Sequence, residues 1–312
     1  MAVILVTSCS NRKAIPPENR LQATELPRAP IEVVGSIWHD WLRSHPHRMP
    51  AGLLYQGRGV VEARSAARTA GASHWFVSAG LGLVSANEEV PGYDLTVSGN
   101  GANHIRKKIE DKVFDPQAWW KELSRHQKPH RTLTRLVRRS NAHLVVLALP
   151  RNYLRMVLGD ISALGPAEMQ RLRIVGPPKN AIPEHLQPFW LPYDSRLDGA
   201  KSPIRGTRID FPQRATRHFF EAIWSSTQKN DLESHIRGVK NALTKLPYPD
   251  IPRRKQLNDE EIIRVIKGLW ARAEGKSGRM LRILRDEEQI ACEQGRFKHL
   301  FNLVKHQFST TL

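Results

Sequence analysis

The chain has 312 residues, of which 40% are hydrophobic, and its eight Trp, nine Phe and five Tyr can fill a substantial core. This composition excludes a disordered tail and leaves room for one large domain or two ordinary ones. Lys and Arg number 48 against 30 Asp and Glu, which gives a net charge of +18 and a pI near 10.3. Clustered cations release counterions when they meet phosphates, so this charge favours a nucleic-acid partner over a soluble protein that is merely basic.

Cysteine content and hydropathy further limit the kinds of protein that this chain can be. The two cysteines, Cys9 and Cys292, are too few for a disulfide framework or a four-thiolate zinc site, and no metal-ligand spacing is present. No window approaches the roughly 20 apolar residues that cross a bilayer, and the opening MAVILV is too short for a signal peptide. We therefore expect a soluble, cytoplasmic protein with no metal, no cofactor, no membrane partner and no obligatory protein partner.

The first 245 residues alternate between predicted strands and helices. Short apolar runs predict four strands, at 3–6, 73–84, 143–150 and 172–178. The second of these runs into a glycine-bearing turn. Helical patterns lie at 31–42, 57–71, 103–139, 152–161 and the end of 202–226. Strands spaced by helices predict a Rossmann-like α/β domain, with a mostly parallel sheet and helices on both faces, over residues 1–245.

A linker rich in Pro and basic residues, 246–256, separates a last unit at 257–312. Asp259 is the expected N-cap of its first helix, because acidic residues follow in the first turn. Three helical patterns predict a small helix-turn-helix or winged-helix DNA-binding unit, and a helical cap on the main domain is the alternative. The candidate recognition helix, EQGRFKHLFNLVKHQ, offers Arg296, Lys298, His299, Lys305 and His306.

In parallel α/β folds, ligands bind beyond the carboxyl ends of the strands. The first strand here ends in SCSNRK, which crowds hydroxyls, a thiol, an amide and two cations into six residues. As a strand-to-helix turn, this loop suits a phosphate or a polar ring. The Walker spacing is absent, which argues against ATP chemistry. Cys9 is either a nucleophile activated by a neighbouring cation or, more commonly for such a residue, a small buried side chain.

Two further strand ends carry candidate binding residues. In SAGLGLVSANEEVPGYDLT, Gly80 permits close backbone approach, and Asp94 is the most site-like carboxylate, with an exposed turn aspartate as the alternative. LPRNYL places Arg151, Asn152 and Tyr153 after an apolar strand. Tyr and Asn at that place can stack on a base and read its edge, or the Tyr can pack under the next helix.

The segment PIRGTRIDFPQRATRHF is dense in arginine. Four arginines lie within thirteen residues, around Gly206 and Asp210: Arg205, Arg208, Arg214 and Arg217. An arginine-rich turn that opens a helix suits phosphate contacts, and its density around a glycine favours that interpretation over an ordinary solvated helix face.

These stretches resemble a bacterial family of unassigned function, whose members open with a Ser/Cys-x-x-Lys type loop and carry a block of the form sa-G-LV…PYD-T. The resemblance rests on SCSNRK, YQGRGVVEARSAARTAG, FVSAGLGLVSANEEVPGYDLT and IRGTRIDFPQRATRHF. The opening loop is similar, more loosely, to those of the archaeosine synthase core domain and of peroxide-stress DNA-binding proteins. The terminal LRILRDEEQIACEQGRFKHLF resembles the extra helical unit of members found in phage-defence loci, which include a DNA glycosylase family that excises glucosylated hydroxymethylcytosine.

The resemblance implies an antiviral DNA glycosylase that cleaves a modified cytosine from double-stranded DNA and leaves an abasic site. Such cleavage passes through an oxocarbenium-like sugar, which needs a carboxylate or positioned water near C1′. The catalytic candidates are Asp94 first, Asp210 second, and Asn11. The base-binding candidates are Ser8, Cys9, Ser10, Gly80, Asn152 and Tyr153. The phosphate-binding candidates are Arg12, Lys13, Arg151, Arg205, Arg208, Arg214, Arg296 and Lys298.

Other functions stay open at this point. Lys13 could form a Schiff base and give lyase activity, although nothing nearby in the sequence clearly desolvates it. A deazapurine-type base transferase acting on tRNA or DNA would need a nucleophile such as Cys9. A non-catalytic DNA-binding stress protein is the third possibility. The glycosylase prediction requires Asn11, Asp94, Tyr153 and Arg208 to converge on one electropositive pocket.

Overall fold

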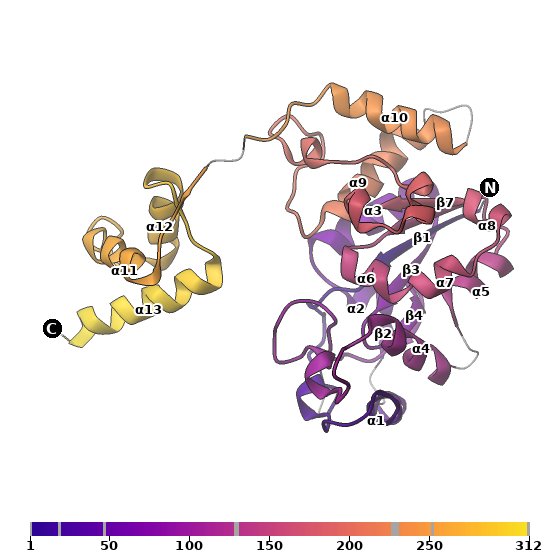
Figure 1. Cartoon of the computed structure of the whole chain (residues 1–312), viewed down its shortest axis with the longest axis horizontal. Coiled ribbons are helices and arrows are strands. Elements are labelled where there is room, and N and C mark those ends of the chain that lie inside the picture. Colours follow the sequence, from indigo (N-terminus) through magenta and orange to yellow (C-terminus); the bar gives the residue numbers. More distant parts are fainter. Residues whose placement is uncertain are drawn as a thin grey trace. The chain divides into compact units, whose positions relative to one another are not determined.

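The computed structural model of the chain describes residues 2–17, 20–45, 48–127, 131–225, 231–250 and 253–310. The chain divides into two compact units, Met1–Pro249 and Asp250–Leu312 (Figure 1). The boundary falls within the Pro-rich stretch 246–256. In the described part of the chain, no helix combines the length and the apolar character needed to span a lipid bilayer.

A five-stranded sheet with the order β4-β3-β1-β6-β7 forms the centre of the first unit. Neighbouring strands are parallel except for the β3–β4 pair, which is antiparallel. The strands are β1 (Val3–Ser8), β3 (Ser73–Ser78), β4 (Gly82–Ser85), β6 (Leu144–Ala148) and β7 (Leu172–Val175). Every residue of β1 and β6 is buried, which explains why both read as continuous apolar runs. The α/β class and the mostly parallel sheet are confirmed.

Helices cover both faces of this sheet (Figure 1). Ile4 and Val6 of β1 belong to a cluster with α1 (Ile31–Ser44) and α4 (Pro116–His126). Val3 and Leu5 belong to a second cluster, because successive strand residues point to opposite faces. That cluster contains α3 (Arg58–Ala70), α9 (Phe211–His218) and α10 (Leu232–Thr244).

The remaining elements of the first unit are short. They include β2 (Met49–Pro50), α2 (Ala51–Leu54), β5 (Glu89–Val90), α5 (Leu133–Arg139), α6 (Arg151–Met156), α7 (Leu158–Ser162) and α8 (Pro166–Gln170). They also include 3₁₀ helices at Ala23–Glu25, Ile105–Lys108, Lys179–Ala181, Glu184–Phe189 and Ser195–Asp198. A π-helical segment, Phe219–Trp224, continues directly from α9.

Some predicted boundaries are right and others are wrong. The helices predicted at 31–42 and 57–71 are α1 and α3, and Gly71 ends α3 in the left-handed conformation with φ 57°. The stretch 73–84 is not one strand, because the chain reverses and β4 returns beside β3. In the stretch 103–139, the described residues are α-helical only in α4 and α5, with a 3₁₀ helix at Ile105–Lys108, and 128–130 lie outside the described residues.

The second unit contains three helices and a pair of two-residue strands. They are β8 (Lys255–Gln256), α11 (Asp259–Gly268), α12 (Ser277–Arg282), β9 (Ile290–Ala291) and α13 (Gln294–Thr310), with a π-helical segment, Ile283–Glu287, after α12. The N-cap of α11 is Asn258 and not Asp259: Asn258 forms a reciprocal capping box with Glu261. The helices are present, but the helix-turn-helix arrangement is not confirmed.

A buried histidine couples the stability of the first unit to pH. His235 of α10 is fully buried, and its Nδ1 accepts a hydrogen bond of 2.9 Å from Arg173 Nε. Burial and the Arg173 charge lower the pKa of His235 to about 4, although Asp231 opposes them. The unfolded chain takes up this proton near pH 6.5 and the folded chain only near pH 4. The free energy of unfolding should therefore fall as the pH decreases through that range.

Urea unfolding at about pH 7 and about pH 4.5 measures this dependence. His235→Gln keeps an acceptor for Arg173 and does not titrate, so the variant should lose less stability on acidification than the wild type. An equal loss in the two proteins would contradict the assignment.

Candidate active site

A cleft of about 1140 Å³ opens beyond the carboxyl ends of β1, β6 and β7. Its position follows from the strand order. The chain leads from β1 to β3 on one side and from β6 to β7 on the other, so β1 and β6 flank the point where the connections diverge. Open α/β sheets bind ligands at such a point. All of the lining residues belong to the first unit.

Many of the predicted site residues meet in this cleft. From the loop after β1 and from two later segments, the lining includes Ser8, Cys9, Ser10, Asn11, Arg12, Arg151, Tyr153 and Arg208. Asn152 is exposed beside them, and its amide donates to Ser98, another lining residue, at 3.3 Å. Of the four residues on which the glycosylase prediction depends, Asn11, Tyr153 and Arg208 line the cleft and Asp94 does not.

The loop after β1 is not the strand-to-helix turn that the sequence suggests, because no helix begins in residues 9–17, the described residues that follow it directly. Lys13 instead pairs antiparallel with Tyr55, and the Arg12 carbonyl accepts from the Gln56 amide at 2.9 Å. The Ser10 hydroxyl donates to the same carbonyl at 2.7 Å. The loop is therefore tied to the segment that leads into α3.

Lys13 holds this loop and does not line the cleft. Its ammonium donates to the carbonyls of Ser10 and Asn11 at 3.3 and 3.4 Å and lies 4.1 Å from the centre of the Tyr93 ring. Burial lowers the pKa of Lys13, although the nearby Cys9 and Asp94 oppose the shift. The expectation that nothing desolvates Lys13 is therefore wrong, but its amine is engaged with the loop carbonyls.

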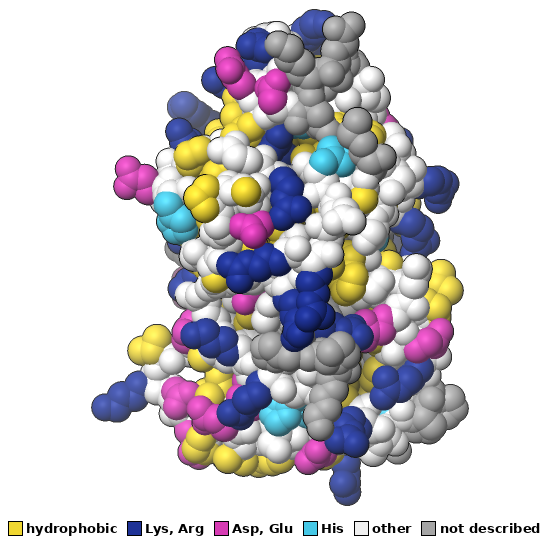
Figure 2. All heavy atoms as spheres, turned by 90° about the vertical axis from the view of Figure 1, so that its right-hand side faces the viewer, with side chains coloured by type: hydrophobic (Ala, Val, Ile, Leu, Met, Phe, Trp, Pro, Cys, Tyr) yellow, Lys and Arg dark blue, Asp and Glu magenta, His cyan; other side chains and the backbone are white. Residues whose placement is uncertain are grey.

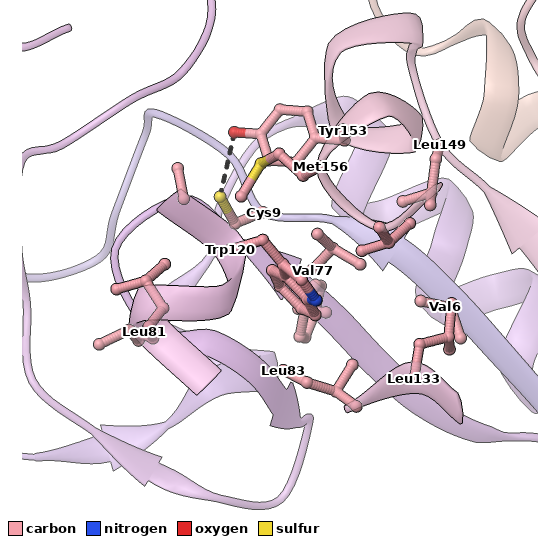
Figure 3. Close-up of a cluster of buried hydrophobic side chains, with 14 of the residues drawn as sticks. Val6, Cys9, Val77, Leu81, Leu83, Trp120, Leu133, Leu149, Tyr153 and Met156 are labelled. Atoms are coloured by element: carbon pink, nitrogen blue, oxygen red, sulfur yellow. Dashed lines mark hydrogen bonds between the residues drawn. The ribbon is translucent and has the colours of Figure 1, made fainter. Parts of the chain in front are cut away.

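Cys9 and Tyr153 form part of the cleft lining and continue into the core. Figure 3 shows the two side chains pointing toward one another, with Met156 and Trp120 beside them. The Cys9 Sγ lies 3.3 Å from the Tyr153 Oη, and Cys9 is 8% exposed. Burial raises the pKa of Tyr153 well above its ordinary value, so the phenol keeps its proton.

The N-terminus of α3 also lines the cleft, and sequence reasoning missed it. The lining residues are Gly57, Arg58 and Gly59, and Gly57 has a φ of 106°, which favours glycine. No side chain caps this helix, so its first N–H groups and the positive end of its dipole are available to an anion. The signal in the sequence was Gly-Arg-Gly before an apolar helix without a capping residue.

Gln213 of α9 lies against this helix start. A Cβ built on Gly59 would be 3.4 Å from the Gln213 Oε1. Gln213 is 5% exposed and lines the cleft, and its Oε1 has no hydrogen-bond partner among the described residues. A buried acceptor without a partner costs free energy, which a ligand N–H or O–H can recover.

The described carboxylates of the cleft are Asp194 and Asp198, neither of which the sequence singled out. Trp190 forms a bridge with Ile174 of β7, and the Leu191 amide donates to the Ile174 carbonyl at 2.9 Å. This pairing carries the chain that follows, including Asp194, past the carboxyl end of the sheet. Nothing in FWLPYDSRLDG indicates the pairing, so the segment read as a plain loop.

Arg196 keeps Asp194 ionised. Its Nε and Nη2 donate to the two carboxylate oxygens of Asp194 at 2.8 to 3.1 Å. Burial alone would raise the pKa of Asp194, but the hydrogen bonds and charge of Arg196 outweigh burial and hold it below its ordinary value. Asp194 therefore stays a carboxylate at neutral pH, in an ion pair with Arg196.

Asp94 and Gly80 lie outside the cleft and have structural roles. The Asp94 carboxylate accepts from the Asn103 amide, and its backbone pairs with Gln22. Gly80 packs so closely that a Cβ would lie 2.6 Å from the Tyr93 ring. Neither residue is placed to meet a ligand in this cleft.

Arg214 and Asp210 are also buried away from the cleft. Arg214 is fully buried, and each of its five N–H groups has an acceptor: the carboxylates of Asp198 and Asp210 and the carbonyls of Leu197, Ile204 and Thr207. The prediction that Arg214 contacts phosphate is therefore wrong. Gly206 leaves room for the guanidinium, because a Cβ there would overlap it.

The other predicted cations have varied surroundings. Arg205 is exposed and donates to the Ala200 carbonyl, whereas Arg217 is paired with Glu62 and Glu221. In the second unit, Arg296 pairs with Asp259 at 2.6 Å, and Lys298 is exposed on α13.

Positive charge is not confined to the cleft. The described cations that line it are Arg12, Arg58, Arg151, Lys179 and Arg208. Figure 2 shows further Lys and Arg side chains near the middle of the face on the side of the N-terminus.

Within the described ranges, no group of three or more His, Cys, Asp or Glu side chains is placed to hold a metal ion. No family model, curated protein or solved structure matches the chain.

Removing the Arg214 charge should destabilise the protein strongly. Arg214→Met removes the buried partner of Asp210, which is 3% exposed, and leaves only the half-exposed Arg58, at 3.3 Å, to compensate its charge. Breaking a buried pair costs about 3–5 kcal/mol. Arg237→Met is the matched control, because Arg237 forms an exposed pair with Glu233 on α10 and should cost below about 1 kcal/mol. Urea unfolding of both variants measures the difference, and equal costs would contradict the central role of Arg214.

Proposed function

We propose that the protein is a DNA glycosylase whose cleft takes in an extruded, modified nucleotide and cleaves its N-glycosidic bond. The observation that carries this proposal is the meeting of an ionised carboxylate, Asp194, with exposed arginines and an open helix N-terminus in one cleft at the strand ends. The activity that the family resemblance implies agrees with this proposal, except that Asp194 takes the place of Asp94.

Phosphate binding is the first requirement. Arg12, Arg151 and Arg208 are exposed and line the cleft, so they can contact the strand on either side of the target. The uncapped start of α3 supplies N–H groups for a phosphate next to the extruded nucleotide. In the second unit, taken by itself, exposed basic side chains of α13, such as Lys298, can also contact phosphates.

Base recognition is the second requirement. Two half-buried aromatic side chains of the cleft, Trp190 and Phe211, can stack on a base. Tyr153 and Tyr193 form a buried part of the lining. The unpartnered Gln213 Oε1 can accept from the exocyclic amino group of a cytosine. The volume of about 1140 Å³ exceeds the usual range for small ligands, about 300–1,000 Å³, and leaves room for a base that carries a sugar.

Bond cleavage is the third requirement. The bond between C1′ and the base nitrogen breaks, and its electron pair leaves with the base. A water hydroxyl adds to C1′, and the water proton ends on the departing base. The Asp194 carboxylate stabilises the positive charge that develops on the sugar and orients the water.

The decisive experiment incubates the full chain with unmodified, hydroxymethylated and glucosylated duplex DNA and analyses the products by mass spectrometry. Release of free base from modified DNA supports the proposal. Binding without release from any of the three would leave a DNA-binding protein and end the glycosylase proposal.

A base transferase is the second candidate, because the Cys9 thiol lines the cleft beside Tyr153. Covalent exchange would need this thiol as nucleophile. Cys9→Ser separates the two functions: a glycosylase keeps its turnover, whereas a Cys-dependent transferase loses it.

Asp194→Asn should lower base release by about 100-fold or more, because an amide cannot supply the negative charge. DNA affinity should change by less than about threefold, since Asn still caps the turn that Asp194 begins. Asp94→Asn is the matched control and should leave the release rate within about threefold. Single-turnover assays measure these rates, and a large loss in the Asp94 variant alone would reverse the assignment.

Arg208→Ala should weaken DNA binding to a similar extent on every sequence and reduce the slope of log affinity against log salt by about 1, because one phosphate contact is lost. Fluorescence anisotropy over a range of salt concentrations measures the slope. Arg237→Ala, on an exposed pair outside the cleft, should leave the slope unchanged. An unchanged slope for Arg208→Ala would remove this residue from the DNA interface.

A further inference from the structure

Ile209 is an apolar side chain held in solvent beside the cleft. It is 88% exposed, the highest value among the large hydrophobic residues that the structure describes, and it lines the cleft. Its neighbour Arg208 is exposed and lines the cleft as well, and Arg205 is exposed nearby in sequence. Single exposed hydrophobic residues are common on protein surfaces, so exposure alone does not assign a role.

The backbone around Ile209 is fixed from below. The buried Arg214 donates to the carbonyls of Ile204 and Thr207, at 2.9 Å each, and the Asp210 carboxylate accepts from the Thr207 amide at 2.8 Å. Arg58 of α3 donates to the Arg205 carbonyl. These bonds hold the loop on both sides of Ile209, whose β-branched side chain has few rotamers of its own.

A glycosylase that acts on a duplex must unstack its target. Unstacking costs a few kcal/mol, and proteins offset this cost by inserting an apolar side chain between base steps. Such a side chain has to be apolar, exposed and rigidly presented, and it needs cations beside it that hold the backbone. Ile209, with Arg205 and Arg208 in the same loop, has each of these properties.

We propose that Ile209 is the wedge that enters the base stack and occupies the space of the extruded nucleotide, so that the substrate is double-stranded DNA. This inference rests on the proposed glycosylase function and adds the step that precedes bond cleavage. Ile209 is a positioning residue, because it acts on the stack and not on the reacting atoms.

The test compares Ile209→Ala with Ile209→Met in the full chain, with Val113→Ala as control. Val113 is 80% exposed in the first unit and does not line the cleft. Each protein is assayed on glucosylated hydroxymethylcytosine in a paired duplex and in the same strand alone.

Ile209→Ala should lose about tenfold or more in rate on the duplex and little on the single strand, because only the duplex needs unstacking. Ile209→Met should restore most of the duplex rate, and Val113→Ala should match the wild type. Equal losses on the two substrates, or no loss on the duplex, would overturn the proposal.

Extrusion of the nucleotide can also be measured independently of bond cleavage. A duplex with 2-aminopurine beside the target becomes more fluorescent when the wild type unstacks it, and Ile209→Ala should produce less of this increase at saturating protein. An equal increase for both proteins, or none for the wild type, would overturn the wedge. A wild type that raises the fluorescence but releases no base would retain the wedge and refute the glycosylase function, so the two failures are distinguishable.

Discussion

The buried guanidinium of Arg214 is the interaction on which the geometry of the cleft depends. Its five N–H groups all have acceptors, two of them on carboxylates and three on backbone carbonyls between Leu197 and Thr207. A buried charge is tolerated only when it is paired and fully hydrogen-bonded, so the chain around it has little freedom to move. The segment that contains Asp198 and the loop that contains Ile209 are therefore fixed by the same side chain.

The sheet decides where this arrangement lies. Because connections from β1 and β6 diverge, the carboxyl ends of these strands leave a space that no crossover covers. The loop after β1, the start of α3 and the start of α6 all open into that space. Cations, aromatic rings and a carboxylate from distant parts of the sequence meet there because the topology brings their segments to one edge.

The sequence predicts those parts of the molecule that local physics determines. Apolar runs identify the buried strands, the glycine at 71 marks the end of α3, and two of the strand-end motifs, SCSNRK and LPRNYL, do line the cleft. Within PIRGTRIDF and its continuation, however, Arg208 and Arg214 are indistinguishable by sequence. Their difference arises because Arg214 meets Asp198 and Asp210 in the interior, which depends on tertiary packing. Asp194 was missed for a similar reason, since the pairing of Trp190 with β7 has no local signature.

The pairing of Trp190 with β7 also protects one edge of the sheet from pairing with another chain. β7 is the last strand of the sheet, and an uncovered outer strand presents free N–H and C=O groups to any other chain. The Leu191 amide and the Trp190 bridge use part of the hydrogen-bonding edge of β7. The Trp190 indole also donates to the Pro177 carbonyl at 3.0 Å. The segment that places Asp194 at the cleft therefore also shields the edge strand β7 from pairing with another chain. A substitution that released this segment would therefore be expected to lower solubility and, at the same time, to displace Asp194 from the cleft.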